Sequence, residues 1–149
     1  MTYAVWTAAV ALGVTGAACH RPMSRINGPS ESKEGIKVEL LDVECREEGN
    51  NPDPEDIVDV AMNLAITNGS NQSVQFRPNL MRLIDSHGAT PPWTSSSMPI
   101  PKGERRLTQV RFIDSRGTSC RDRMKVDFAD SLTLGEPVQE TPIGFIPEE

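Results

Sequence analysis

The sequence is poor in the residues that most often carry catalytic chemistry. Only 5% of its 149 residues are aromatic, and it has two histidines and three cysteines. It contains no Cys-x-x-Cys, no Gly-x-Ser-x-Gly, no glycine-rich phosphate loop and no paired-carboxylate motif. These absences leave dithiol redox chemistry, serine hydrolysis and nucleotide-dependent catalysis without a motif. We therefore expect a protein that is not an enzyme and has no cofactor.

Positive charge is also scarce. The chain has 15 Lys and Arg against 21 Asp and Glu, a formal net charge of −6. A surface of this sign repels polyanions, so nucleic acid is not expected as a partner. The length fits one domain with a core of its own, and 12 Pro and 11 Gly favour short strands and turns over helices.

No apolar run is long enough to span a bilayer, but the first eighteen residues form a distinct segment. Residues 1–18 hold no ionisable side chain except Tyr3, and residues 4–14 have the length of the apolar core of a signal peptide. The small residues Gly16 and Ala18 precede Cys19. The segment resembles the export signal of a bacterial lipoprotein, which implies removal of residues 1–18 and lipidation of Cys19. Simple secretion with cleavage after Ala18, giving a soluble ligand-binding domain, is the alternative.

Residues 19–35 lack any hydrophobic period. The stretch after Cys19 is rich in Ser, Gly, Pro and charged residues. That composition is typical of a flexible tether, and a tether behind a lipidated cysteine would hold a folded domain away from the membrane.

Residues 36–149 carry the pattern of an all-β domain. The clearest strand is expected over residues 57–67, where apolar and polar residues alternate and one face would be buried. A hairpin through Asn68-Gly69 is expected to pair it with residues 74–76. The parity shift at Leu40-Leu41 indicates a β-bulge in the preceding strand. We expect seven or eight strands in an antiparallel β-sandwich, because further strands are indicated over residues 81–84, 107–113, 124–128 and 143–146.

The order of these elements resembles a known class of domain. A strand, an Asn-Gly turn, Leu83-Ile-Asp-Ser-His-Gly88, and then Pro101-Lys-Gly-Glu104 before a strand ending in Val-Arg-Phe112 are similar to the small immunoglobulin-like domains of bacterial exported lipoproteins. The resemblance implies a domain of unknown function attached to the cell envelope. It carries over no catalytic residue.

The cysteines other than Cys19 form an even pair. Cys45 and Cys120 are each expected at or beside a strand end, and an oxidising compartment favours a disulfide between them. Such a bridge closes a loop of about 75 residues, which would stabilise the fold by about 4 to 5 kcal/mol on the chain-entropy model. Two separate thiols are the alternative.

Three further residues are candidates for function. His87 and Met98, with ten residues between them, could begin a copper site of a periplasmic metal-handling module, since imidazole and thioether suit Cu(I), but no second His-x-Met pair follows. We therefore expect no metal site. Trp93, after two prolines, is a candidate contact for a protein partner.

Taken together, these patterns predict a non-enzymatic β-sandwich of the bacterial cell envelope, anchored in the membrane through Cys19 and facing the periplasm or the cell exterior. Its role would be binding or structural, through an envelope protein partner. The sequence leaves the oligomeric state open.

Overall fold

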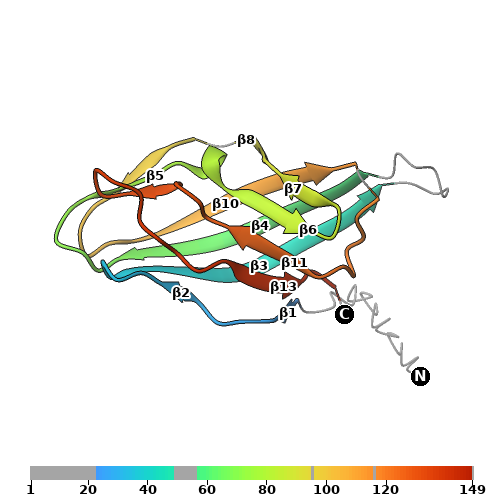
Figure 1. Ribbon diagram of the computed structural model, residues 1–149, viewed down its shortest axis with the longest axis horizontal. Helices are drawn as coiled ribbons and strands as arrows, with labels where there is room; N and C mark the ends of the chain where they lie inside the picture. Colours follow the sequence, from blue (N-terminus) through green and yellow to red (C-terminus); the bar gives the residue numbers. More distant parts are fainter. Residues whose placement is uncertain (1–22, 49–56, 95, 116, 149) are drawn as a thin grey trace, which may run out of the picture.

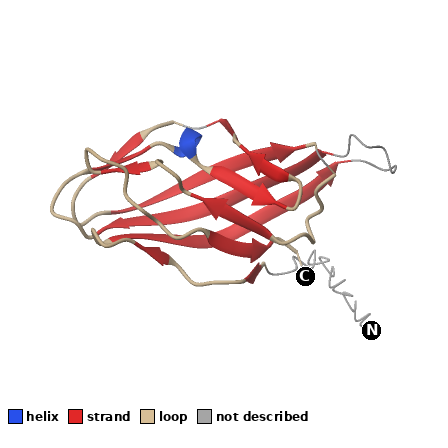
Figure 2. Ribbon diagram, viewed as in Figure 1, coloured by secondary structure: helices blue, strands red, loops and turns tan. Residues whose placement is uncertain are grey.

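The computed structural model of the protein describes residues 23–48, 57–94, 96–115 and 117–148. More than half of these residues form strands, which loops connect (Figure 2), and there is one 3-10 turn, η1, at Pro78–Leu80. The prediction of an all-β chain with antiparallel pairing is confirmed. The thirteen described strands exceed the predicted seven or eight because several strands span only two or three residues.

The strands form two five-stranded sheets and one three-stranded sheet, drawn in Figure 1. The first sheet has the order β1(Ser24–Arg25), β13(Ile143–Ile146), β11(Met124–Asp127), β6(Arg82–Asp85), β7(Gly88–Thr90). The second has the order β2(Ser30–Glu31), β3(Ile36–Glu48), β4(Ile57–Asn68), β10(Arg105–Asp114), β8(Pro92–Thr94). The small third sheet has the order β12(Leu132–Thr133), β5(Val74–Phe76), β9(Met98–Ile100).

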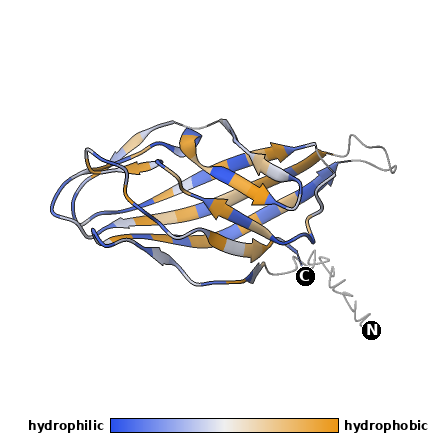
Figure 3. Cartoon of the chain, viewed as in Figure 1, coloured by the Kyte–Doolittle hydropathy of each residue, from blue (hydrophilic) through white to orange (hydrophobic). Residues whose placement is uncertain are grey.

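Strand β4 is the centre of the second sheet and the best-predicted element. Its alternating apolar residues are almost completely buried, and the hydropathy alternation is visible along the ribbon in Figure 3. It pairs along nearly its whole length with β3 on one side and β10 on the other. The buried residues of β4 that face the core are Val58, Val60, Met62, Leu64 and Ile66.

A single core joins the two large sheets. All four phenylalanines of the chain are at most 1% exposed, and they come from four different segments: Phe76, Phe112, Phe128 and Phe145. An aromatic side chain buries about 150 to 250 Å² on folding, so a chain with few aromatics gains most by placing them here. The core thus uses every phenylalanine of the chain.

The predicted bulge in the first long strand is present. The register of β3 against β4 shifts between Leu40 and Asp42, so that Leu41 is the extra residue. Leu40 and Val43 are both buried, although their positions differ in parity. The bulge therefore lets one strand keep its apolar residues inward on both sides of the shift.

The expected hairpin between residues 57–67 and 74–76 is wrong. Strand β5 pairs with β9 and β12 in the third sheet, and no pairing joins it to β4. Neither Asn68 nor Gly69 has a positive φ, so this is no two-residue hairpin turn. Gly69 is required for another reason: a Cβ there would lie 2.7 Å from the carbonyl oxygen of Gly35. The segment leaves one sheet and enters another.

Asn68 holds this crossing point together. Its side chain is fully buried, and its Nδ2 donates to the carbonyl oxygens of Gln72 at 2.7 Å and Ile100 at 2.8 Å. Its Oδ1 accepts from the backbone N–H of Ser70 at 3.0 Å and from the Ser70 hydroxyl at 2.7 Å. One amide thus connects β4, the following loop and β9.

The tether prediction is wrong for residues 23–35. Strand β1 pairs with β13 through Ser24 and Ile146, and β2 pairs with β3 through Ser30 and Val38. Between them, Asn27 Nδ2 donates to the carbonyl oxygen of Pro142 at 3.0 Å, and its Oδ1 accepts from Gly144 N–H. A strand of two residues is too short to show a hydrophobic period. The hydrogen bonds of this segment are also made with backbone groups far away in the sequence, so no local pattern marks it. Residues 19–22, including Cys19, lie outside the described residues.

We predict that Asn68→Ala destabilises the domain by about 1 to 3 kcal/mol, because it removes both donors to the buried carbonyl oxygens. Urea unfolding followed by circular dichroism measures the change. Asn71→Ala, at an exposed position in the same loop, is the matched control and should stay within about 0.5 kcal/mol. Equal stability of the two variants would show that Asn68 does not hold the crossing.

Candidate functional site

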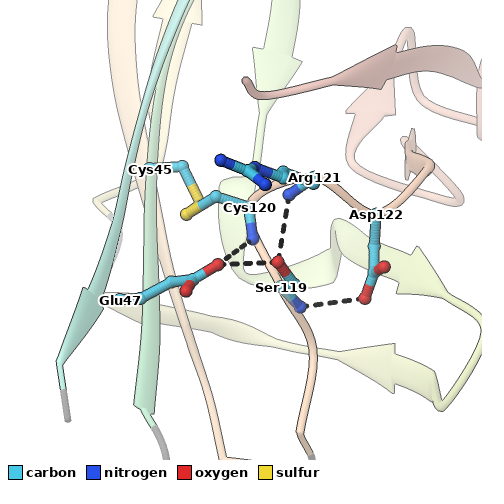
Figure 4. Close-up of a disulfide and its surroundings, with 6 residues drawn as sticks. All are labelled: Cys45, Glu47, Ser119, Cys120, Arg121 and Asp122. Atoms are coloured by element: carbon cyan, nitrogen blue, oxygen red, sulfur yellow. Dashed lines mark hydrogen bonds between the residues drawn. A yellow bond between two sulfur atoms is a disulfide. The ribbon is translucent and has the colours of Figure 1, made fainter. Parts of the chain in front are cut away.

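The two cysteines predicted to pair are joined by a disulfide (Figure 4). Cys45 lies in β3 of the second sheet, and Cys120 lies in the loop that leads to β11 of the first sheet. Their Cα atoms are 5.7 Å apart. The bridge therefore links the two large sheets covalently at one end of the domain, and both cysteines are buried.

A polar cluster beside the disulfide orders the Cys120 loop. One oxygen of Glu47 accepts from the Ser119 hydroxyl and from the backbone N–H of Cys120, both at 2.7 Å. The Ser119 N–H in turn donates to Asp122 at 2.8 Å. The bonds from Ser119 and Cys120, with the nearby Arg121 charge, lower the pKa of Glu47 below its usual 4.5. No sequence motif marked Glu47, because its partners lie 72 and 73 residues away.

The turn that carries His87 is fixed by hydrogen bonds. Asp85 Oδ1 accepts from the backbone N–H groups of His87 at 2.7 Å and Gly88 at 3.0 Å, the pattern of an Asx turn. The buried Thr118 hydroxyl bonds to Asp85 and, at 3.2 Å, to the buried Asp114. The predicted Asp-Ser-His-Gly turn is thus confirmed as the connection between β6 and β7, and it also anchors the loop after β10.

This turn does not have the geometry of a catalytic triad. The Ser86 hydroxyl lies 3.2 Å from His87 Nδ1, and Asp85 Oδ1 lies 3.9 Å from that same nitrogen. A triad needs the nucleophile and the orienting acid on opposite ring nitrogens, so that the proton can move between them. Here Ser86 and Asp85 both lie on the side of the same ring nitrogen, His87 Nδ1.

His87 and Met98 are not brought together as a copper site. His87 lies in the β6–β7 turn of the first sheet, while Met98 begins β9 of the third sheet and packs against the core. Within the described ranges, no group of three or more His, Cys, Asp or Glu side chains is placed to hold a metal ion. The fold separates the two candidate ligands.

Trp93 is the most exposed large apolar side chain among the described residues. It is 65% exposed and lies in β8, at the edge of the second sheet. Leu107, on the neighbouring β10, is 64% exposed. The outer face of this sheet also holds an ion pair in which the Arg111 guanidinium donates to both oxygens of Asp59. The structure therefore presents an aromatic side chain to solvent on β8, which pairs with β10 at Arg111, and an aliphatic side chain four residues away along β10.

A partly buried carboxyl group lies at the other end of the domain. Glu140 accepts a hydrogen bond from the Ser30 hydroxyl, which itself accepts from the backbone N–H of Thr141 at 2.8 Å. Burial raises the pKa of Glu140 above its usual 4.5, and the charges of Glu31 and Glu34 act in the same direction, against the bonds from Ser30 and Ser32. Glu140 thus fastens the segment before β3 to the segment before β13.

The chain is similar to a known protein in its fold but not in its sequence. No protein-family model and no curated protein matches the sequence. The fold is similar to a crystal structure from Bacillus subtilis described as a "putative lipoprotein (ycdA)", with a TM-score of 0.55 and 9% identity. The match covers 78% of this chain and 38% of that protein, so the present chain spans well under half of its length. At this identity the similarity shows a shared β-rich fold.

The described residues contain no helix that is both long and apolar enough to cross a membrane, since η1 spans three residues. Lipidation of Cys19, which lies outside those residues, stays a prediction.

We predict that Glu140→Gln makes the domain more stable at pH 7 and leaves its stability at pH 4 unchanged. At pH 4 the Glu140 carboxyl is mostly protonated in both states. As the pH rises above 4.5, the carboxyl ionises first in the unfolded chain, and the free energy of unfolding falls until the pH exceeds the raised pKa of the folded state. Glutamine cannot ionise, so the variant avoids that loss. Urea unfolding at pH 4 and pH 7 measures the free energy of unfolding, and Glu136→Gln, at an exposed position, is the control. A gain of equal size at both pH values would contradict the burial cost.

Proposed function

We propose that the protein is a lipid-anchored, non-enzymatic domain of the bacterial cell envelope that acts by binding a protein partner. The observation that carries the proposal is the pairing of its cysteines. Cys45 and Cys120 are joined to each other, which leaves Cys19 as the third cysteine of the chain. Cys19 stands directly after the export-type segment, at the position that a lipoprotein signal reserves for the lipidated residue.

The disulfide is consistent with a location in the cell envelope. A disulfide that joins two sheets persists where the surroundings are oxidising, as on the outer side of the bacterial inner membrane. The description of the protein with the similar fold as a "putative lipoprotein" also supports this compartment. We propose a location on the periplasmic or external side of the envelope.

The strand order supports an immunoglobulin-like β-sandwich as the fold. Constant-type domains of that class have strands A, B, E and D in one sheet and C, F and G in the other, with an added C′ strand beside C in variable-type domains. In this chain β3, β4, β10 and β8 are neighbours in that order, as are β6, β11 and β13, with β7 beside β6. The disulfide departs from the antibody pattern, because it joins β3 to the loop before β11 instead of the equivalents of strands B and F.

Binding is supported by the exposure of Trp93 on an edge strand. Tryptophan is enriched among the residues that dominate protein interfaces, because it buries a large area at a small entropic cost. Exposing it on a chain whose phenylalanines are all buried has no benefit for folding. We propose Trp93 and the adjoining outer face of β10 as the partner contact.

We predict that Cys19→Ser moves the protein from the detergent phase to the aqueous phase in detergent partitioning, because the acyl chains that hold it in the bilayer are lost. Intact mass of the mature wild type should show Cys19 as the first residue, carrying the lipid. The double variant Cys45→Ser/Cys120→Ser is the control and should keep the lipid. A wild-type protein in the aqueous phase with an unmodified Cys19 would support the secreted, soluble alternative.

We predict that a photo-reactive phenylalanine analogue at position 93 crosslinks to a discrete envelope protein in intact cells. The same analogue at the exposed Lys102, in the turn before β10, is the control. Trp93→Ala should change the free energy of unfolding by no more than about 0.5 kcal/mol, since the side chain is exposed. Identical crosslinking patterns at the two positions would contradict a partner contact at Trp93.

A further inference from the structure

The described chain begins against the first sheet, close behind Cys19. Only residues 20–22 separate Cys19 from Met23, and Ser24 already pairs with Ile146 of β13. Four residue steps span at most about 14 Å. A lipid on Cys19 would therefore hold this end of the domain at the membrane surface. A flexible tether of residues 19–35, by contrast, would have let the domain move away from that surface.

The outer face of the first sheet lies next to that point. Lys125 of β11 pairs with Gly144 of β13 on one side and with Ile84 of β6 on the other, which places these three residues in one row across the sheet. Their strand neighbours Leu83, Met124, Val126, Ile143 and Phe145 are buried on the inner face. The row therefore belongs to the outer face.

Ile26 adds an apolar side chain to this row. Its N–H donates to the carbonyl oxygen of Gly144 at 2.9 Å, and it is 46% exposed. A Cβ at Gly144 would lie 3.3 Å from Ile26 Cβ, so the glycine gives the isoleucine room to lie across β13. A shallow hollow results, and we call it with its rim the basal face: Ile26, Ile84, Arg123, Lys125 and Gly144.

The exposed charge of the basal face is positive, although the whole chain is acidic. Arg123 and Lys125 are both exposed, and neither forms an ion pair with another described residue. The acid that borders the hollow, Asp85, has a side chain only 1% exposed and bonds to Thr118 and its own turn. By contrast, Lys37 and Arg105 on the second sheet both pair with Glu39.

We propose that the basal face lies against the anionic surface of the membrane that anchors Cys19. Apolar side chains flanked by basic ones match the boundary between acyl chains and anionic headgroups. Two basic residues near such a surface contribute too little for binding alone. The anchor supplies the missing affinity by keeping the face at high effective concentration. This inference rests on the proposed lipid anchor, and it points the second sheet, with Trp93, away from the bilayer.

Tryptophan fluorescence in proteoliposomes tests the orientation. The mature lipidated protein carries Trp93→Phe to remove the native signal, and Ile84→Trp as the reporter on the basal face. Leu107→Trp, on the outer face of the second sheet, is the matched reporter. In vesicles of phosphatidylglycerol and phosphatidylethanolamine with brominated acyl chains, we expect at least about twofold stronger quenching at position 84 than at 107. Equal quenching at the two positions overturns the proposal.

Charge reversal tests which chemistry the face recognises. Arg123→Glu/Lys125→Glu should abolish the difference in quenching, because like charges repel the face from phosphatidylglycerol. The double variant Lys33→Glu/Lys102→Glu changes the net charge equally but at exposed turns before β3 and β10, and should keep the difference. Quenching at position 84 that survives the first double variant overturns the assignment to anionic lipid.

The same samples separate failure of this inference from failure of the anchor. Intact mass and detergent partitioning report whether Cys19 carries lipid, independently of fluorescence. An aqueous, unmodified protein refutes the anchor itself. A lipidated protein with equal quenching keeps the anchor and refutes the basal face. Circular dichroism and the absence of free thiols confirm that each variant is folded.

Discussion

The register of β4 between its two neighbours is the constraint on which the rest of the structure depends. Because side chains alternate between the faces of a strand, a slip of one residue would turn the whole apolar set of β4 outward. The bulge at Leu41 allows β3 to follow this register past a change of parity. The ion pair between Asp59 and Arg111 fixes β4 and β10 on the outer face in the same alignment. With β4 in place, the inner faces of both sheets can close on one core.

The sequence was sufficient for whatever depended on local pattern. The alternation in β4, the bulge, the Asp85–Gly88 turn and the apolar faces of β10, β11 and β13 could be predicted because each is encoded within about ten residues. The pairing of Cys45 with Cys120 followed from the count of cysteines. These predictions fixed the all-β class and most of the core.

Features that depend on distant partners could not be predicted. Asn68-Gly69 looks like a hairpin turn, yet its geometry is set by Gly35, Gln72 and Ile100. Strands β1 and β2 have two residues each and no period, and their places are decided by contacts with Pro142, Gly144 and Glu140. The same limit applied to the candidate surfaces. Trp93 could be named from its type, whereas the basal face combines residues from four separate parts of the chain.

The pairing of β1 with β13 joins the first described strand to the last one, and this has a consequence for the order of events in the export proposed above. A chain that crosses a membrane from its N-terminus presents residue 24 long before residue 146. The first sheet cannot be completed until the final strand has emerged, since closing this contact requires nearly the entire domain. During that interval β1 has no sheet partner, because it pairs with β13. In the export proposed above, an enzyme that acts on the residues before β1 could therefore do so before β1 enters the first sheet.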